Sequence, residues 1–319
     1  MRIGIVGLDS SHAVEFGRRV QILNAAGVTR CRVSCCWNPA SPAGDRATRL
    51  PPALENLGIE PAASLEELLG AVSGLMILSA DGHQHLAPAV RALRLGIPTF
   101  IDKPLTCSAI EARALLDTAS GSRCFSASAL RFADGLNTIT ASALGDFRTI
   151  EASGPFQETP AAPGLWYYGC HTFEFVDSLW PQRGGIEQVR ARLLETGHHI
   201  ELKYRDGRSA VIGLDRTGDS PWRARINGAR GDAAFVANLG PAYDRLVAEI
   251  CSFFEGKPPI VSLHRTVEII QTIDACHQSI AMGGAWMPVP EVCRPPECGT
   301  CDCPTAGSPH MATAAGEKI

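Results

Sequence analysis

The sequence has no long apolar run, and this excludes one broad class of protein. Its longest apolar stretches are far shorter than the roughly 18 residues that a membrane-spanning helix needs. Neither sign of charge dominates, since 29 Lys and Arg residues stand against 33 Asp and Glu residues, a formal net charge of −4. This balance gives no electrostatic basis for binding nucleic acid or an anionic membrane. We therefore expect neither of these as a partner.

No apolar targeting segment stands at the N-terminus. The strand-like run Ile3–Val6 begins almost at once, so we expect no signal peptide and a cytoplasmic protein. Most of the 12 cysteines are scattered singly or in a pair through the part that should fold, as is typical of small buried hydrophobic residues in a reducing compartment. These are Cys31, Cys35, Cys36, Cys107, Cys124, Cys170, Cys251 and Cys276.

What is present is a regular alternation of strand and helix patterns over residues 1–130. Apolar runs that are continuous rather than alternating predict parallel strands covered on both faces. The expected strands are 2–6, 31–37, 74–79, 97–102 and 123–128, and the expected helices are 11–26, 64–70, 84–95 and 108–119. This order predicts an α/β fold whose N-terminal domain is a doubly wound parallel sheet of the Rossmann type.

Residues 131–283 predict a second, α+β domain on a mostly antiparallel sheet. Several of its segments alternate polar and apolar residues, and Asp206-Gly207 is a strong hairpin turn between two of them. The expected strands are 186–195, 199–205, 208–215, 222–227 and 232–238, and the expected helices are 171–179, 241–255 and 263–282. If these helices leave part of the sheet uncovered, Ile200, Leu202, Tyr204 and Val211 form an apolar face for self-association.

From residue 284 to 319 the periodicity is lost and Pro, Gly, Ala and Cys dominate, which predicts a mostly disordered tail. Cys293, Cys298, Cys301 and Cys303 supply four thiols there, the number that a zinc or iron–sulfur site needs. Their spacing matches no strong motif, so we predict no metal site while leaving this alternative open.

The turn after the first strand is the first candidate site. It reads Gly7-Leu8-Asp9-Ser10-Ser11-His12, and of the glycines in the dinucleotide fingerprint only Gly7 is kept. The free N–H groups at the start of the following helix attract a phosphate, whereas Asp9 repels one. Ser10 and Ser11 offer hydrogen bonds in compensation. Two interpretations stay open, a loop that binds a cofactor and a turn that only caps a helix.

Other polar residues follow the neighbouring strands, at the edge where such sheets bind ligands. Asn38 ends the second strand, and since it cannot repel a 2′-phosphate while Arg46 follows it, NADP is favoured slightly over NAD. An ordinary turn at Asn38 is the alternative. Ser79 ends the third strand. His83 and His85 come next, where a metal site is weakly indicated because no third ligand is evident, and a solvated turn is the alternative.

Lys103 and His171 are the candidates for proton transfer. Lys103 follows the fourth strand and precedes a proline, and in a partly buried position its pKa would fall. His171 and Glu174 lie three residues apart on a predicted helix, with Asp177 further along it, so His171 and Glu174 share one face. A histidine whose pKa is near neutral beside a carboxylate is a common acid/base pair. The alternative is a core helix in which His171 satisfies a local hydrogen bond.

Taken together, residues 1 to about 283 resemble the glucose–fructose oxidoreductase / inositol dehydrogenase / MocA (Gfo/Idh/MocA) family. The resemblance rests on the order and spacing of several motifs. These are Ile3–Gly7, His85, Asp102-Lys103-Pro104, Arg131-Phe132, Leu144-Gly145 and the segment from Tyr167 to Glu174.

The resemblance implies roles for these residues. Lys103 would contact the substrate hydroxyl and the nicotinamide ribose, and His171 would be the general acid/base. Tyr167 takes the place of the family's aspartate, and Glu174 preserves its later acid. The cofactor, NAD or NADP, would lie against Gly7, Asp9, Ser10, Ser11, His12, Asn38, Ser79, His85, Asp102, Lys103 and Arg131.

The expected activity is therefore that of an NAD(P)-dependent oxidoreductase. It would transfer a hydride to or from a small hydroxyl or carbonyl compound, sugar- or polyol-like, or an imine. The alternative is a non-catalytic relative that binds a ligand or a partner, which Asp9 and Tyr167 favour. Members of the family often dimerise through the sheet of the second domain, so we expect a homodimer or a higher homo-oligomer.

Overall fold

The computed structural model describes most of the chain. The described residues are 1–39, 52–119, 123–136, 144–160, 162–180, 182–218 and 220–292. Arg46 and the four cysteines from Cys293 to Cys303 lie outside these ranges, so the predictions that rest on them are not addressed.

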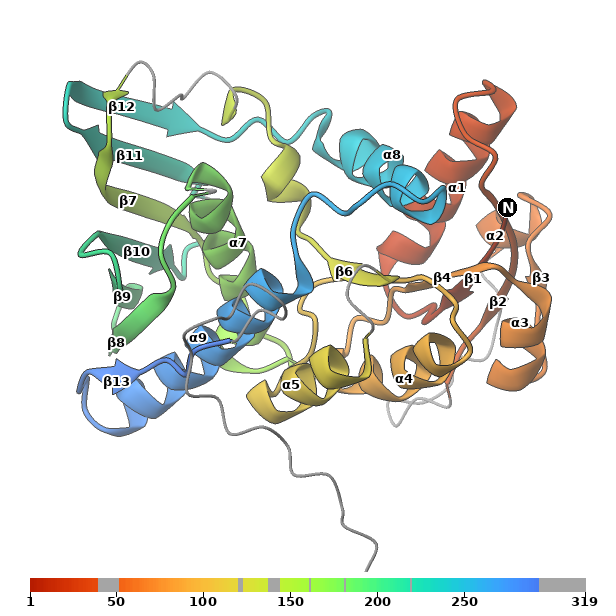
Figure 1. The fold of residues 1–319 in the computed structure, drawn as a ribbon, viewed down its shortest axis with the longest axis horizontal. Helices are drawn as coiled ribbons and strands as arrows, with labels where there is room; N and C mark the ends of the chain where they lie inside the picture. Colours follow the sequence, from red (N-terminus) through yellow and green to blue (C-terminus); the bar gives the residue numbers. More distant parts are fainter. Residues whose placement is uncertain are drawn as a thin grey trace, which may run out of the picture.

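The N-terminal domain is a parallel sheet with the order β3-β2-β1-β4-β5-β6 (Figure 1). This is the order of a doubly wound dinucleotide-binding fold, and it confirms the predicted fold class. The strands are β1 Arg2–Val6, β2 Arg32–Trp37, β3 Glu60–Pro61, β4 Gly74–Ile77, β5 Thr99–Ile101 and β6 Cys124–Ser126. The helices are α1 Ser11–Ala25, α2 Pro52–Glu55, α3 Leu65–Ala71, α4 Leu86–Arg94 and α5 Ala109–Thr118, with the 3₁₀ turns η2 Gly82–Gln84 and η4 Ala129–Phe132.

Local sequence signals explain where two of these helices begin. The Ser64 hydroxyl accepts the Glu67 N–H at 3.1 Å at the start of α3, and Ser108 accepts the Glu111 N–H at 3.4 Å at the start of α5. Both are the caps that a serine three residues before a glutamate predicts.

The second domain contains a seven-stranded sheet of order β12-β11-β7-β10-β9-β8-β13. Its pairs are antiparallel except β10 with β7, so the prediction of a mostly antiparallel sheet is confirmed. The strands are β7 Phe147–Pro155, β8 Ile186–Leu194, β9 Gly197–Tyr204, β10 Ser209–Asp215, β11 Arg223–Gly228, β12 Gly231–Val236 and β13 Met287–Pro288. The other elements are the 3₁₀ turn η6 Gly164–Trp166, α7 Gly169–Leu179, α8 Ala242–Phe254 and α9 Leu263–Ala281.

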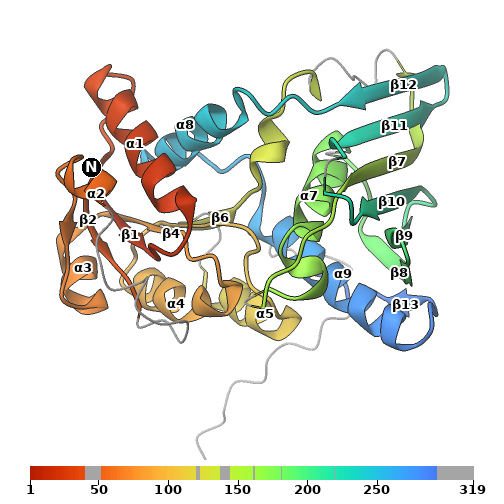
Figure 2. The same cartoon turned by 180° about the vertical axis from the view of Figure 1, so that it is seen from behind.

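Helix α8 belongs to the second domain by sequence but packs on the first. Its apolar side chains Leu246, Ile250 and Phe253 join one buried cluster with Ile3 of β1 and Phe16 of α1. Figures 1 and 2 show α8 lying beside α1. A boundary at residue 130 therefore divides the sequence into two parts, but the packing crosses it, because α8 shares a buried cluster with the first domain.

The prediction of an uncovered apolar sheet face is wrong for three of its four residues. Ile200, Leu202 and Tyr204 are at most 2% exposed, because α7 and α9 pack against the face that carries them (Figure 2). Val211 alone is partly exposed on the other face, where Glu201 and Arg190 pair at 2.6 Å. Self-association stays a prediction. The exposed face of the sheet carries an ion pair rather than the apolar residues on which the prediction was based.

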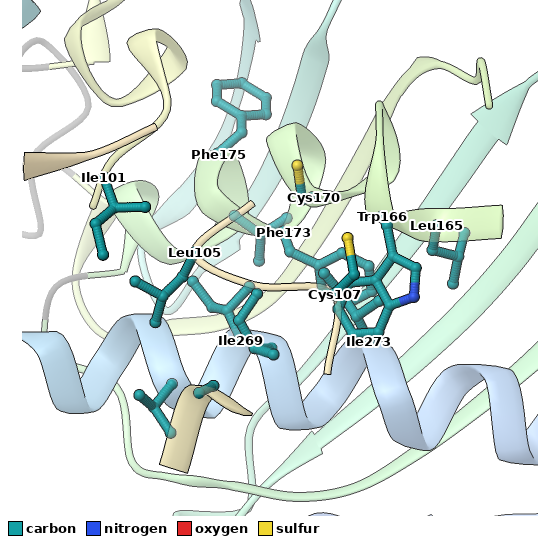
Figure 3. Close-up of a cluster of buried hydrophobic side chains, with 14 of the residues drawn as sticks. Ile101, Leu105, Cys107, Leu165, Trp166, Cys170, Phe173, Phe175, Ile269 and Ile273 are labelled. Carbon is teal, nitrogen blue, oxygen red and sulfur yellow. The ribbon is translucent and has the colours of Figure 1, made fainter. Parts of the chain in front are cut away.

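Apolar packing joins the two domains. Figure 3 shows Ile101, the last residue of β5, and Leu105 in the loop after it, together with Phe173 of α7 and with Ile269 and Ile273 of α9. These side chains form one continuous buried cluster, so the position of the Lys103 loop is tied to that of α7. The eight cysteines predicted to be buried are all buried and unpaired.

The predicted tail begins too early. Residues 284–292 are described, β13 pairs with β8, and Val289 is only 2% exposed. The Trp286 ring also receives the Lys203 ammonium at 4.2 Å from its centroid. Residues 287–289 thus complete an edge of the second sheet. Within the described ranges, no helix combines the length and the apolarity that crossing a membrane requires.

Candidate active site

Four of the predicted site residues follow strands that end at one edge of the parallel sheet. Val6 pairs in register with Trp37 and with Ile77, and Ile77 pairs with Ile101. The residues just beyond these strand ends, which are Gly7, Asn38, Ser79 and Asp102, therefore lie along the same edge. This is where open α/β sheets bind ligands.

The turn after β1 is fastened to the loop after β4 rather than serving only as a helix cap. The Ser10 hydroxyl donates to the Leu78 carbonyl at 2.7 Å and makes no cap bond to α1, although Ser10 is the N-cap residue. Asp9 accepts the Ala80 N–H at 3.1 Å. No side chain among the described residues therefore caps the first turn of α1, and its N–H groups can receive an anion. Ser11 begins α1 and is exposed.

Gly7 and Ser79 touch each other. Gly7 has a φ of +88°, and a Cβ built on it would overlap the backbone of Ser79. Glycine is therefore required here for the close approach of two strand ends. Ser79 is 1% exposed, and its hydroxyl has no hydrogen-bond partner among the described residues.

Asn38 holds the same turn from the other side. Its side-chain oxygen accepts the Leu8 N–H at 2.9 Å, and the Trp37 carbonyl accepts the Gly7 N–H at 3.1 Å. Asn38 is thus placed at the end of β2 as predicted. Its side chain organises the turn.

His12 takes the place of the last glycine in the fingerprint and reaches across to β5. Its Nδ1 lies 2.6 Å from the carboxylate of Asp102, and its ring stacks on Phe16 at 5.0 Å. The Tyr243 hydroxyl lies 3.4 Å from Nε2. Burial alone would raise the pKa of Asp102, but the charge and hydrogen bond of His12, helped by Lys103, lower it to about 2. Asp102 is therefore a buried carboxylate that stays ionised.

Lys103 is partly buried at the junction of the domains, after a short strand and before a cis proline. Its ammonium lies 5.1 Å from the centroid of the Tyr167 ring, a cation–π contact. Burial works to lower the pKa of Lys103, but the Asp102 carboxylate and weaker neighbours raise it by more. The expected lowering of this pKa is thus wrong, and Lys103 stays protonated at neutral pH.

His171 lies in the first turn of α7 and faces the same junction. Its Nδ1 is 2.7 Å from the Ser128 hydroxyl. Its Nε2 has no hydrogen-bond partner among the described residues. Burial, followed by the positive charge of Lys103, lowers the pKa of His171 well below its ordinary value. The ring is therefore neutral near pH 7, and the expectation that it titrates there is wrong.

Glu174 does not orient His171, because it belongs to a different cluster. It pairs with Arg131, whose guanidinium also reaches Asp177 at 2.7 Å. Arg183 and Arg265 converge on the same Asp177 carboxylate, and Arg183 pairs with Glu268 at 2.6 Å. Three arginines and three carboxylates thus balance in charge. The Arg131 and Glu174 side chains are 7% and 3% exposed, so this cluster secures the fold behind the site rather than lining it.

His85 is likewise a connecting residue. It is fully buried, with Nδ1 3.0 Å from the Pro104 carbonyl oxygen and Nε2 3.0 Å from that of Ser79. It joins the end of β4 to the Lys103 loop, and both ring nitrogens are engaged. His83 is exposed, unlike His85, and no cluster of three or more metal-binding side chains occurs among the described residues.

Three residues at this site were not predicted from the sequence. Ser128 positions His171, and it ends a predicted strand at the functional edge, which was a usable signal. Tyr168 and Trp222 each place a ring edge-to-face with His171, with centroids 5.7 and 5.8 Å away. Trp222 lies about fifty residues from His171 in sequence, and no local pattern joins the two.

The comparisons with known proteins agree with this arrangement. Residues 1–128 match the GFO_IDH_MocA family, described as an oxidoreductase family with an NAD-binding Rossmann fold. This match covers the N-terminal domain and agrees with the predicted family, with the oxidoreductase class and with NAD or NADP as the kind of cofactor. Among curated proteins, no sequence matches the chain.

Solved structures extend the similarity over nearly the whole chain. The myo-inositol dehydrogenase from Lactobacillus casei, in complex with NAD(H) and myo-inositol, has a TM-score of 0.76 at 14% identity, covering 93% of this chain and 98% of its own. A myo-inositol dehydrogenase from Corynebacterium glutamicum scores 0.74 at 16% identity, covering 91% and 99%. An oxidoreductase domain protein from Kribbella flavida scores 0.73 at 16%, also covering 91% and 99%. At these identities the similarity establishes the two-domain fold.

Proposed function

We propose that this chain is an NAD(P)-dependent dehydrogenase or reductase in which Lys103 and His171 handle the proton. The observation that carries the proposal is that these two residues, from different domains, come together. The charge of Lys103 acts on His171, and the Tyr167 and Tyr168 rings bridge the space between them, with centroids 5.2 Å apart. A protein that served only as a scaffold has no physical need for this pairing.

The residues at the sheet edge fit a dinucleotide. In the part of the chain that the structure describes, the first turn of α1 has no side-chain cap and the buried Ser79 hydroxyl beside Gly7 has no partner, which suits a pyrophosphate. The Asp9 carboxylate, which would oppose an anion, accepts the Ala80 N–H. When bound, the nicotinamide would supply the hydride acceptor or donor. Lys103 and Asp102, at the end of β5, would border it, with Arg131, Glu174 and His85 holding the surrounding loops.

The two proton-handling groups have complementary states. Lys103 carries a proton at neutral pH and can donate a hydrogen bond to a substrate oxygen. His171 is neutral, so its Nε2 can accept the proton that leaves a hydroxyl as it becomes a carbonyl. A positive charge beside Lys103 is unfavourable, and His171 should therefore hold that proton only briefly. The Lys103 ammonium lies over the face of the Tyr167 ring. A carboxylate at position 167 would instead form an ion pair with Lys103 and compete with the substrate oxygen for its hydrogen bond.

The substrate is expected to be a small molecule with a hydroxyl, carbonyl or imine group. The Lactobacillus casei structure holds myo-inositol on the same fold, which supports a sugar- or polyol-like compound. Asn38 carries no charge that would exclude a 2′-phosphate, so we keep both NAD and NADP.

Turnover tests the proposal. Reduction of NAD⁺ and NADP⁺ is followed by absorbance against a panel of cyclic and open-chain polyols, and the reverse reaction against ketones and imines. Lys103→Ala and His171→Ala should each lower turnover about 10²–10⁴-fold, while cofactor affinity stays within a few-fold. If His171→Ala turns over an active substrate at the wild-type rate, its role as the base is wrong, and Tyr167 is the next residue to test.

A further inference from the structure

We propose that Tyr168 and Trp222 form an aromatic wall that selects substrates with a flat ring face and discriminates against open-chain ones. The proposal deepens the function proposed above and rests on it. It assigns specificity to two residues that the sequence motifs leave without a role.

The wall continues from the proton-handling pair. Tyr167, under the Lys103 ammonium, contacts Tyr168 with ring centroids 5.2 Å apart, and Tyr168 stacks on Trp222 at 6.1 Å with an interplanar angle of 22°. All three rings are only partly buried, while His171 beside them is 9% exposed. Half-buried aromatic rings in a row, next to a histidine whose Nε2 has no hydrogen-bond partner among the described residues, are a surface on which a flat ligand can lie.

Trp222 is held in this position by features of its surroundings. Its indole lies against Gly154 of β7, where any Cβ would overlap it, and its Nε1 donates to the Thr172 hydroxyl at 3.2 Å. The missing side chain of Gly154 and one hydrogen bond thus fix the position of the indole beside His171.

Carboxylates, which would accept hydrogen bonds from the hydroxyl groups of any polyol, are engaged elsewhere. Glu174 and Asp177 are paired with arginines, and Asp102 is paired with His12. In the described part of the chain, the titratable groups beside the wall are therefore one ammonium and one neutral imidazole. Such a site gains affinity mainly from packing against the ring of the ligand, and less from hydrogen bonds to its hydroxyl groups.

The test compares two ligands that carry six hydroxyl groups each. myo-Inositol is a ring and sorbitol is an open chain. Calorimetric titration of each into the protein saturated with NADH measures binding without turnover, because an alcohol cannot react with the reduced cofactor. We expect myo-inositol to bind at least about tenfold more tightly, because the C–H face of its ring can pack on the aromatic rings, and tenfold corresponds to about 1.4 kcal/mol.

Trp222→Leu should reduce this preference to within about threefold, and Trp222→Phe, which keeps a ring, should retain most of it. Tyr168→Leu gives an independent loss if the tryptophan variants fold poorly. Trp286→Leu is the matched control, since that half-buried indole lies on the other side of the second sheet, against Arg190 and Lys203, and should change nothing at the site.

Three results would overturn the proposed wall. These are equal affinities in the wild type, no binding of either compound, and a preference that survives in both Trp222→Leu and Tyr168→Leu. The NADH titration separates this from the proposed function. If NADH binds and the ring preference is absent, only the wall is wrong. If NADH and NADPH both fail to bind, the dehydrogenase itself is wrong.

Discussion

Replacing Asp177 by asparagine should destabilise the protein strongly while sparing the cofactor site. The carboxylate is 3% exposed and receives Arg131, Arg183 and Arg265, so Asp177→Asn leaves one uncompensated positive charge in the interior. Breaking a buried pair in this way costs about 3–5 kcal/mol. At roughly 2–4 °C per kcal/mol, the melting temperature should fall by about 6–20 °C.

The assay is thermal unfolding followed by circular dichroism, with Asp232→Asn as the matched control. Asp232 pairs with Arg225 at 3.0 Å, but their side chains are 48% and 61% exposed, so that loss should be below about 1 kcal/mol. At a temperature where Asp177→Asn is folded, its affinity for NADH should equal that of the wild type. Equal melting temperatures for the two variants would refute the reasoning. A lost affinity in a folded variant would show that the cluster contacts the cofactor.

Four further outcomes are expected. Ser128→Ala removes the hydrogen bond to His171 and should lower turnover about three- to tenfold at unchanged NADH affinity, an effect that Ser128→Thr should largely restore. His12→Ala releases the turn from the Lys103 loop and should weaken NADH binding by about tenfold, with His12→Gln intermediate; an unchanged dissociation constant would contradict this. Because burial and a nearby ammonium lower the pKa of His171, it stays neutral as pH falls below 6.5, so the acid limb of the turnover profile should lie well below that value; an inflection near 6.5 that vanishes in His171→Gln would contradict the assignment. Truncation after Gly283 removes β13 and should lower the melting temperature, whereas truncation after Val292 should not; equal melting of both would show that the edge strand contributes nothing.

The parallel sheet could be predicted from the sequence because its strands are continuous apolar runs between capped helices. Strand β7 was missed for the opposite reason. It is central in its sheet, yet apart from Phe147 and Ile150 it carries small or polar residues, and Gly154 is there to make room for Trp222. Such a strand is recognised by its neighbours rather than by its own pattern.

The candidate site was predicted in position but not in its electrostatics. The strand order alone placed Lys103 at the sheet edge, and the helix pattern placed His171 at the start of α7. Their pKa directions depend on Asp102, which His12 fixes from ninety residues away, and on Lys103 acting on His171 across the domain junction. The partner of Glu174 also comes from another element, since Arg131 lies in η4. Long-range pairs of this kind leave no local sequence signal.

Fluorescence titration of the full-length protein with NADH and with NADPH tests the central claim most directly. We predict saturable binding of at least one of them, weakened by His12→Ala and retained in Lys103→Ala and His171→Ala. Absence of binding by both, in a protein shown to be folded, would contradict a dinucleotide site at the edge formed by Gly7, Asn38, Ser79 and Asp102.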